Sequence, residues 1–172
     1  MERIKRFIRQ HLNKFIPVLS FLFVCCQDST QYYSYQPVSS AGWNREDTLL
    51  YTITPSLPKG NHEIQIGIRH SESYAYRDIW LGLRYSLKDS LACDTIHFYL
   101  ADEDGNWHGK GMGGLIQFVK NTSVVLSTQD TISPFDLQIF HLMNDSLLKH
   151  VCDVGIRLSF APSCINTEED EQ

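Results

Sequence analysis

The chain has 172 residues, of which 42% are hydrophobic, and this length allows one globular domain with its own core. Its formal net charge is −5, from 20 Asp and Glu against 15 Lys and Arg. Basic residues gather at the N-terminus, so the chain beyond residue 24 carries 10 Lys and Arg against 19 Asp and Glu, a net charge of −9. That excess of acid argues against nucleic acid and anionic lipid as partners.

Residues 1–25 have the pattern of a signal peptide. Five Lys and Arg residues precede a ten-residue apolar run, residues 15–24, which is too short to span a membrane. The run ends at Cys25 and Cys26. A cysteine at this point predicts a lipoprotein signal peptide, in which the new N-terminal cysteine carries a lipid and holds the protein at a membrane. An ordinary leader with incidental cysteines is the alternative.

Residues 26–42 are polar, rich in serine and interrupted by Pro37, which predicts a tether. From residue 43 to 162 the apolar residues alternate with polar ones, and turn residues recur. We therefore expect strands at residues 48–54, 63–70, 78–87, 93–100, 135–143 and 153–160. A helix over residues 134–150 is the rival for the fifth of these, and residues 115–119 and 123–127 form a short pair of either type.

This pattern predicts an all-β fold, a single antiparallel β-sandwich of jelly-roll or Ig-like kind. Clean alternation, with Ile64, Ile66 and Ile68 on one side of their strand, indicates one buried face per sheet. Residues 163–172 end in EEDEQ and are predicted to be an acidic disordered tail. Three cysteines remain in the domain and tail, and an odd number at these spacings fixes no disulfide pairing: Cys93, Cys152 and Cys164.

Residues 101–114, ADEDGNWHGKGMGG, form the most unusual stretch, because five glycines stand between two strand-like segments. Asp102, Asp104 and Asn106 have the spacing of the first ligands of a calcium loop. Trp107, however, stands where such a loop needs glycine, and Gly113 where it needs a bidentate glutamate. Turn formation by the aspartates is the stronger interpretation.

The same stretch does not fit a phosphate-binding loop, because Asp104 replaces the first glycine and Gly111 replaces the magnesium-binding Ser or Thr after Lys110. The histidines are scattered, and no Ser or Cys has the surroundings of a nucleophile. We therefore expect no catalytic residues, no metal and no cofactor, and we expect a binding or structural protein.

Five aromatic residues lie in loops or on the presumed outer face of the sheets: Trp43, Tyr74, Tyr76, Trp80 and Trp107. Such a set can form a protein interface or a sugar-stacking platform. The opposing interpretation is that some of them pack beneath their own loops. Within the glycine-rich stretch, the residues predicted to meet a partner are Asp102, Asp104, Trp107 and Lys110.

Several segments together resemble the gliding motility lipoprotein GldH family of the Bacteroidota. The resemblance rests on the leader ending in Cys26-Gln27-Asp28, the tyrosine-bearing segment after it, WNRED at residues 43–47, YAYRDIWL at 74–81, LADEDGNWHGKGMG at 100–113 and DVGIRL at 153–158. The most specific piece is D-x-D-G-x-W-x-G-K-G.

The resemblance implies a non-enzymatic lipoprotein at the outer membrane, an accessory of the gliding motility and type IX secretion machinery. Its partners would be other envelope lipoproteins or proteins of that machinery. The spacing from Cys26 to Tyr32 and Tyr35 is similar to that of the family, so the resemblance favours Cys26 over Cys25 as the lipidated residue. A carbohydrate-binding lipoprotein that uses Trp43, Trp80 and Trp107 is the alternative.

Overall fold

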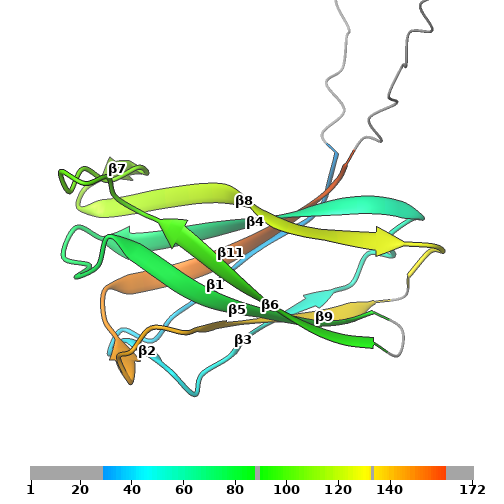
Figure 1. Ribbon diagram of the computed structural model, residues 1–172, viewed down its shortest axis with the longest axis horizontal. Coiled ribbons are helices and arrows are strands. Elements are labelled where there is room, and N and C mark those ends of the chain that lie inside the picture. Colours follow the sequence, from blue (N-terminus) through cyan, green and yellow to red (C-terminus); the bar gives the residue numbers. More distant parts are fainter. Residues whose placement is uncertain (1–28, 88–89, 133, 162–172) are drawn as a thin grey trace, which may run out of the picture.

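The structure is a computed structural model that describes residues 29–87, 90–132 and 134–161. The secondary-structure elements in this part of the chain are all β-strands, and all strand pairings are antiparallel. Two sheets face each other, as Figure 1 shows. The predicted all-β sandwich is therefore confirmed. The predicted signal peptide with Cys26, and the acidic tail with Cys164, lie outside the described residues.

The five-stranded sheet has the order β1 (Thr30–Pro37), β11 (Val151–Phe160), β4 (Gly60–Ser71), β8 (Leu115–Thr128) and β7 (Lys110–Met112). The four-stranded sheet has the order β3 (Leu49–Ile53), β9 (Phe135–His141), β5 (Asp78–Leu87) and β6 (Ser90–Tyr99). A small ribbon pairs β2 (Trp43–Asn44) with β10 (Leu147–Leu148).

The strand predictions are confirmed for β3, β4, β5, β6 and β11, with small changes at their ends. The rival helix over residues 134–150 is wrong: Leu137 and Ile139 are buried on one face of β9 while Asp136 is exposed on the other. The segments 115–119 and 123–127 belong to one long strand, β8, with a register shift opposite Glu63 and Gln65 of β4.

The core lies between the sheets and is built from the inward side of each alternating strand. The fully buried aliphatic residues include Ile64, Ile66 and Ile68 of β4, Ile79, Leu81 and Leu83 of β5, and Val154, Ile156 and Leu158 of β11. The buried Tyr51 connects the two layers, because its hydroxyl on β3 donates to the carbonyl of Val154 on β11 over 2.7 Å. Burial raises the pKa of Tyr51, so the hydroxyl keeps its proton and the hydrogen bond.

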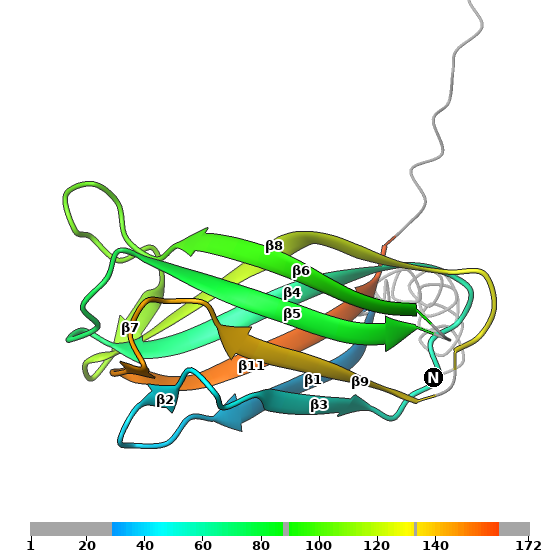
Figure 2. The same ribbon diagram turned by 60° about the horizontal axis from the view of Figure 1, so that its bottom comes forward.

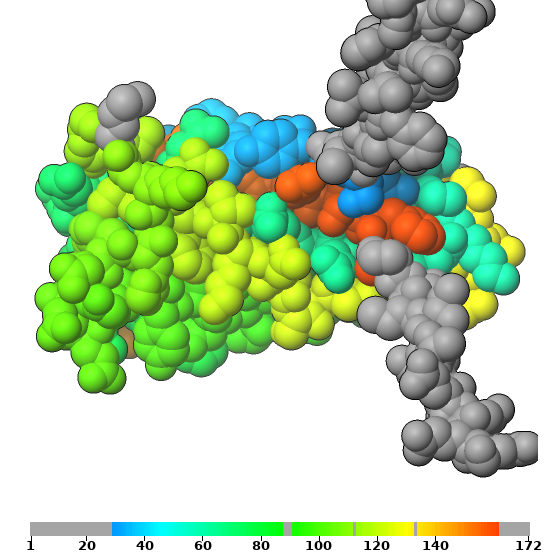
Figure 3. Space-filling view, turned by 90° about the horizontal axis from the view of Figure 1, so that it is seen from above, coloured from blue at the N-terminus to red at the C-terminus, as the bar shows by residue number. Residues whose placement is uncertain are grey.

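The prediction that residues 26–42 form a tether is wrong for residues 30–37. Residues Thr30–Pro37 form β1, the edge strand of the five-stranded sheet, and β1 pairs with β11 through seven residue pairs. Figure 3 looks onto this face and shows β1 in blue beside β11 in orange and red. Domain residues therefore begin about a strand's length earlier than the alternation from Trp43 indicated.

A glycine strip on the outer face explains why β1 joins the sheet. Tyr35 pairs with Gly155 of β11, and Gly155 pairs with Gly67 of β4. The Tyr35 ring lies flat over both glycines: a Cβ added at Gly155 would be 2.5 Å from the ring, and one added at Gly67 would be 2.0 Å from the hydroxyl oxygen. The Arg69 guanidinium covers the ring at 4.1 Å from its centroid.

The Tyr35 hydroxyl also reaches β8, where the Gln117 amide donates to it over 3.3 Å. Burial and the neighbouring Tyr33 raise the pKa of Tyr35 to about 12, so the ring stays neutral. One side chain of the edge strand thus contacts three further strands of its sheet.

We expect Tyr35→Ala to lower the free energy of unfolding by about 2 kcal/mol, less than the loss of a fully buried ring costs, because the variant exposes the glycine strip and removes the contact with Arg69. Urea denaturation measures the change. Tyr33→Ala is the matched control, because Tyr33 lies on the same strand and face but is 58% exposed. An equal effect of the two substitutions would contradict this account of β1.

Candidate functional site

The glycine-rich stretch consists of a capped turn and a tight hairpin. The Asp102 carboxylate accepts hydrogen bonds from the backbone and side-chain amides of Asn106, over 2.8 and 2.9 Å. Gly105 adopts a φ of 84° inside the turn, and Ala101 pairs with Trp107 to close it. These hydrogen bonds lower the pKa of Asp102 and occupy both of its oxygens.

The second half of the stretch is a two-residue hairpin between β7 and β8. Met112 pairs with Leu115, and the intervening Gly113 and Gly114 have φ values of 65° and 82°, as hairpin turns of this length require. Lys110 is exposed at the start of β7, and Asp104 is exposed in the turn. Both stay available for a partner, whereas Asp102 serves the turn itself.

Trp107 packs inward as part of an aromatic cluster. Its ring meets the ring of His70 edge-on, with 4.6 Å between centroids, and Tyr74 contacts both rings, at 5.4 Å from His70 and 6.5 Å from Trp107. Tyr76 touches Tyr74, and its hydroxyl donates to Asp145 over 2.8 Å. Trp107 is half-buried, so the interpretation as a structural loop packed by Trp107 fits its position best.

Two of the five aromatic residues that were predicted to be exposed are buried, so the prediction is wrong for Trp43 and Tyr74. Trp43 is 1% exposed because it closes one end of the core, where its indole donates to the carbonyl of Asp47 and its ring meets His141. Tyr74 is 4% exposed, and its hydroxyl donates to the carbonyl of Asp78 over 3.1 Å. Both residues belong to turn-like segments of the sequence, but their side chains are buried beneath those turns.

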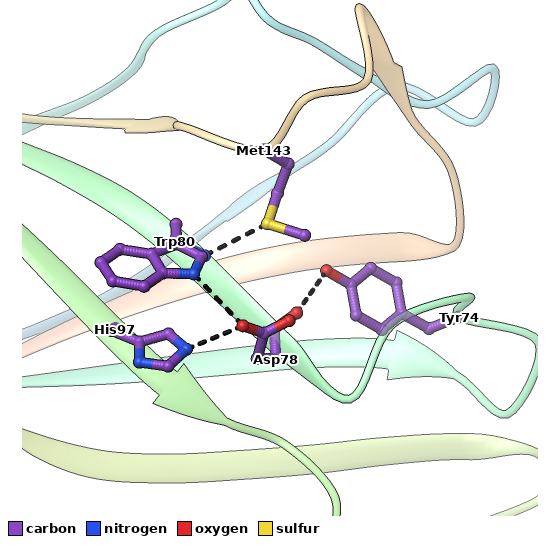
Figure 4. Close-up of polar contacts among 5 residues, drawn as sticks. All are labelled: Tyr74, Asp78, Trp80, His97 and Met143. Carbon is purple, nitrogen blue, oxygen red and sulfur yellow. Dashed lines mark hydrogen bonds and ion pairs between the residues drawn. The ribbon is translucent and has the colours of Figure 1, made fainter.

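Trp80 alone of the predicted set is well exposed, at 41%, on the outer face of the four-stranded sheet. It pairs with His97 of β6, and the two rings stack at 4.0 Å between centroids with 12° between their planes. Figure 4 shows both rings turned to Asp78. The Asp78 carboxylate accepts hydrogen bonds from the Trp80 indole over 3.2 Å and from His97 Nε2 over 2.8 Å.

Two exposed apolar side chains extend this surface. Tyr99, 55% exposed, meets the edge of the His97 ring at 4.5 Å, and Leu142, 44% exposed, follows β9 with its backbone amide bonded to the Trp80 carbonyl. We call the set the Trp80 patch: Asp78, Trp80, His97, Tyr99 and Leu142. The patch is an apolar surface around a polar centre whose groups are hydrogen-bonded to one another, which is the composition of protein interfaces.

Sequence reasoning identified Trp80 but missed the other members, because they come from three segments joined only by strand register. The pairing of β5 with β6 is continuous from Asp78 opposite Tyr99 to Leu87 opposite Ser90. If the two strands are assumed to be joined by two residues, counting back from that connection places His97 opposite Trp80. The sequence had instead suggested that the second strand begins at Cys93.

Among the described residues, no three or more His, Cys, Asp or Glu side chains gather where they could share a metal ion, and no helix is long and apolar enough to cross a membrane. Cys93 and Cys152 are exposed free thiols. A hollow of about 630 Å³ lies beyond the Trp80 patch, but its Arg84 already covers the Phe140 ring and donates to Gln138.

Two buried histidines give the fold a pH dependence. Burial lowers the pKa of His70 and of His141 below the ordinary value of 6.5. The unfolded chain therefore takes up protons at a higher pH than the folded chain, and stability is lost as the pH falls below about 6.5.

We expect the free energy of unfolding to decrease between about pH 7 and pH 5, and His70→Phe to make that decrease shallower because it removes one neutral buried imidazole. Chemical denaturation at a series of pH values measures the slope. His108→Gln, at an exposed position, serves as the control. A slope unchanged by His70→Phe would show that His70 does not contribute.

Comparison with known proteins identifies the family. Among solved structures, the chain is similar to the VP2 subviral particle of infectious bursal disease virus, with 13% identity and a TM-score of 0.29 over 76% of this chain and 30% of that one. The Gx strain of the same virus gives 9% identity and a TM-score of 0.32 over 78% and 31%. The chain thus spans less than a third of these viral chains, and such TM-scores support no common function. No curated protein matches. The model of the GldH lipoprotein family matches residues 30–158, from β1 into β11, and the chain therefore belongs to the GldH lipoprotein family.

Proposed function

We propose that this protein is a non-enzymatic lipoprotein of the outer membrane that supports gliding motility or type IX secretion through contacts with other envelope proteins. Membership of the GldH lipoprotein family and the signal-peptide pattern ending at Cys26 support the anchor. The absence of a metal cluster among the described side chains, and the lack of a nucleophile motif in the sequence, favour a binding role over catalysis.

The Trp80 patch is the observation that carries the proposed contact. Its centre is fixed before any partner arrives, because Asp78 holds both the Trp80 indole and the His97 ring. Immobilising a flexible side chain on binding costs about 0.5–1.5 kcal/mol, and the Trp80 and His97 rings are already held in place in the free protein. Exposed aromatic and aliphatic groups around a satisfied polar centre are the features of an interface core.

The tryptophans do not form the sugar platform that the carbohydrate-binding alternative requires. Trp43 is buried, Trp107 packs on His70, and one face of Trp80 is covered by His97. Stacking of a sugar needs a free ring face, and these three rings share no surface. We therefore do not put this alternative forward.

We expect Cys26→Ala to release the protein from the membrane fraction, because the lipid on Cys26 is the proposed anchor. Cys25→Ala is the matched control, since it changes the neighbouring cysteine and should leave the protein on membranes. Fractionation followed by immunoblotting measures both. Retention of the Cys26→Ala protein on membranes would contradict the anchor.

We expect a photo-crosslinking amino acid at Leu142 to capture a second envelope protein in intact cells, and Trp80→Ala to abolish that product, because the two residues share the patch. Tyr33, which is 58% exposed on the opposite sheet, is the control position. Mass spectrometry of the product identifies the partner and separates it from a second copy of this chain. Equal capture at Tyr33, or none at Leu142, would contradict the proposed contact.

A further inference from the structure

We propose that two copies of the chain pair through their β6 strands, antiparallel and with Thr95 at the centre, so that the two four-stranded sheets form one continuous sheet. Strand β6 is the outer edge of its sheet, as Figure 2 shows, where it runs along the side of the molecule. Its ten residues pair with β5 on one side only. The other side offers a row of backbone donors and acceptors with which another extended chain can pair.

The remaining edges among the described strands are short or guarded. Strand β1 carries Pro37 near its end and uses Gln36 to bond the Leu50 carbonyl of β3. Strands β3 and β7 have five and three residues. Beyond β7, strand β8 carries Lys120 and a register shift where the Thr122 hydroxyl binds the Ile64 carbonyl. Strand β6 has no proline, lysine or register shift.

The side chains of β6 are complementary to themselves. Residues directly opposite in an antiparallel pair lie on the same face, so pairing centred on Thr95 sets each Thr95 against its counterpart. The same register places Leu91, 71% exposed, opposite Tyr99 of the second copy, 55% exposed. These are the most exposed apolar residues of the strand, and aliphatic–aromatic and Thr–Thr pairs are favourable across strands.

Charge disfavours one of the two neighbouring registers. Moving the centre by one residue to Asp94 would set two carboxylates directly opposite each other, which is unfavourable. With Thr95 at the centre, Asp94 faces Ile96 of the second copy. Asp94 points to the inner side of the strand, where the Tyr85 hydroxyl donates to it over 3.0 Å. Asp94 is the one charged residue of β6 on the inner side, and its hydrogen bond with Tyr85 holds its side chain against its own sheet.

The symmetry of such a pair fits an anchored protein. A twofold axis perpendicular to the sheet keeps both five-stranded layers on the same side, and β1, at the N-terminal end of the described chain, belongs to that layer. Both chains can therefore reach one membrane. The pair also brings Leu91 of the second copy against Tyr99, so each Trp80 patch gains an apolar residue from its neighbour.

The test is cysteine crosslinking of the full-length protein in membranes. Cys93, Cys152 and Cys164 are first replaced by serine, and Thr95→Cys or Leu91→Cys is then introduced and treated with a short bifunctional thiol reagent. We expect Thr95→Cys to give a covalent dimer. Leu91→Cys is the matched control: it is on the same strand and highly exposed, but the two Leu91 positions would be about 27 Å apart.

Equal or stronger crosslinking at Leu91 would show random collision and overturn the proposal, as would a Thr95→Cys protein that stays monomeric. Crosslinking of Thr95→Cys only to a different protein would show that a foreign strand occupies the edge. As a second measurement, light scattering should show that Thr95→Lys in the otherwise unaltered protein is at least about tenfold weaker in self-association, because two lysines would face each other. Unchanged association would contradict the register.

Discussion

Gly67 and Gly155 face each other on neighbouring strands, and the absence of two side chains there leaves room for one aromatic ring. Tyr35 occupies that room, and Arg69 covers it. This contact turns a polar, tyrosine-rich segment into β1 and moves the start of the domain to Thr30. If Cys26 carries the lipid, only Gln27 and Asp28 separate it from Ser29, a distance of three residue steps or at most about 10 Å, so the domain is held close to the membrane and not on a long tether.

The opposite sheet uses the same arrangement. On β5 and β9, Phe140 lies over Gly82, where an added Cβ would be 2.3 Å from the ring, and Arg84 covers Phe140 at 5.0 Å. Each outer face thus has an aromatic ring packed on glycine beneath an arginine, which stabilises a sheet surface at the position where a side chain is missing. The two faces differ beyond that point. The four-stranded sheet continues into the Trp80 patch and the unguarded edge of β6, and these features favour it as the face that meets other proteins.

Alternation in the sequence was sufficient for the fold class and for most of the core, because inward residues such as Ile64, Leu81 and Ile156 recur at every second position. It failed for β1, because tyrosines stand on both sides of this strand: Tyr33 and Tyr35 point outward, whereas the inner side carries Tyr32 together with the polar Ser34. It also could not show that Trp43 and Tyr74 fold beneath their own turns. The Trp80 patch depends on the register between β5 and β6 and on the chain after β9, and a single sequence contains no direct signal for either. The glycine-rich stretch was recognised correctly as unusual, but its conformation follows from turn formation by Asp102 and from the hairpin at Gly113 and Gly114.

Amide hydrogen exchange of residues 30–37 in the membrane-anchored protein tests most directly whether β1 is part of the domain. Residues of β1 that bond to β11 should exchange as slowly as their partners in β11, because opening them requires Tyr35 to leave the glycine strip. Exchange at the rate of an unstructured chain, with β11 still protected, would show that this segment is a tether after all.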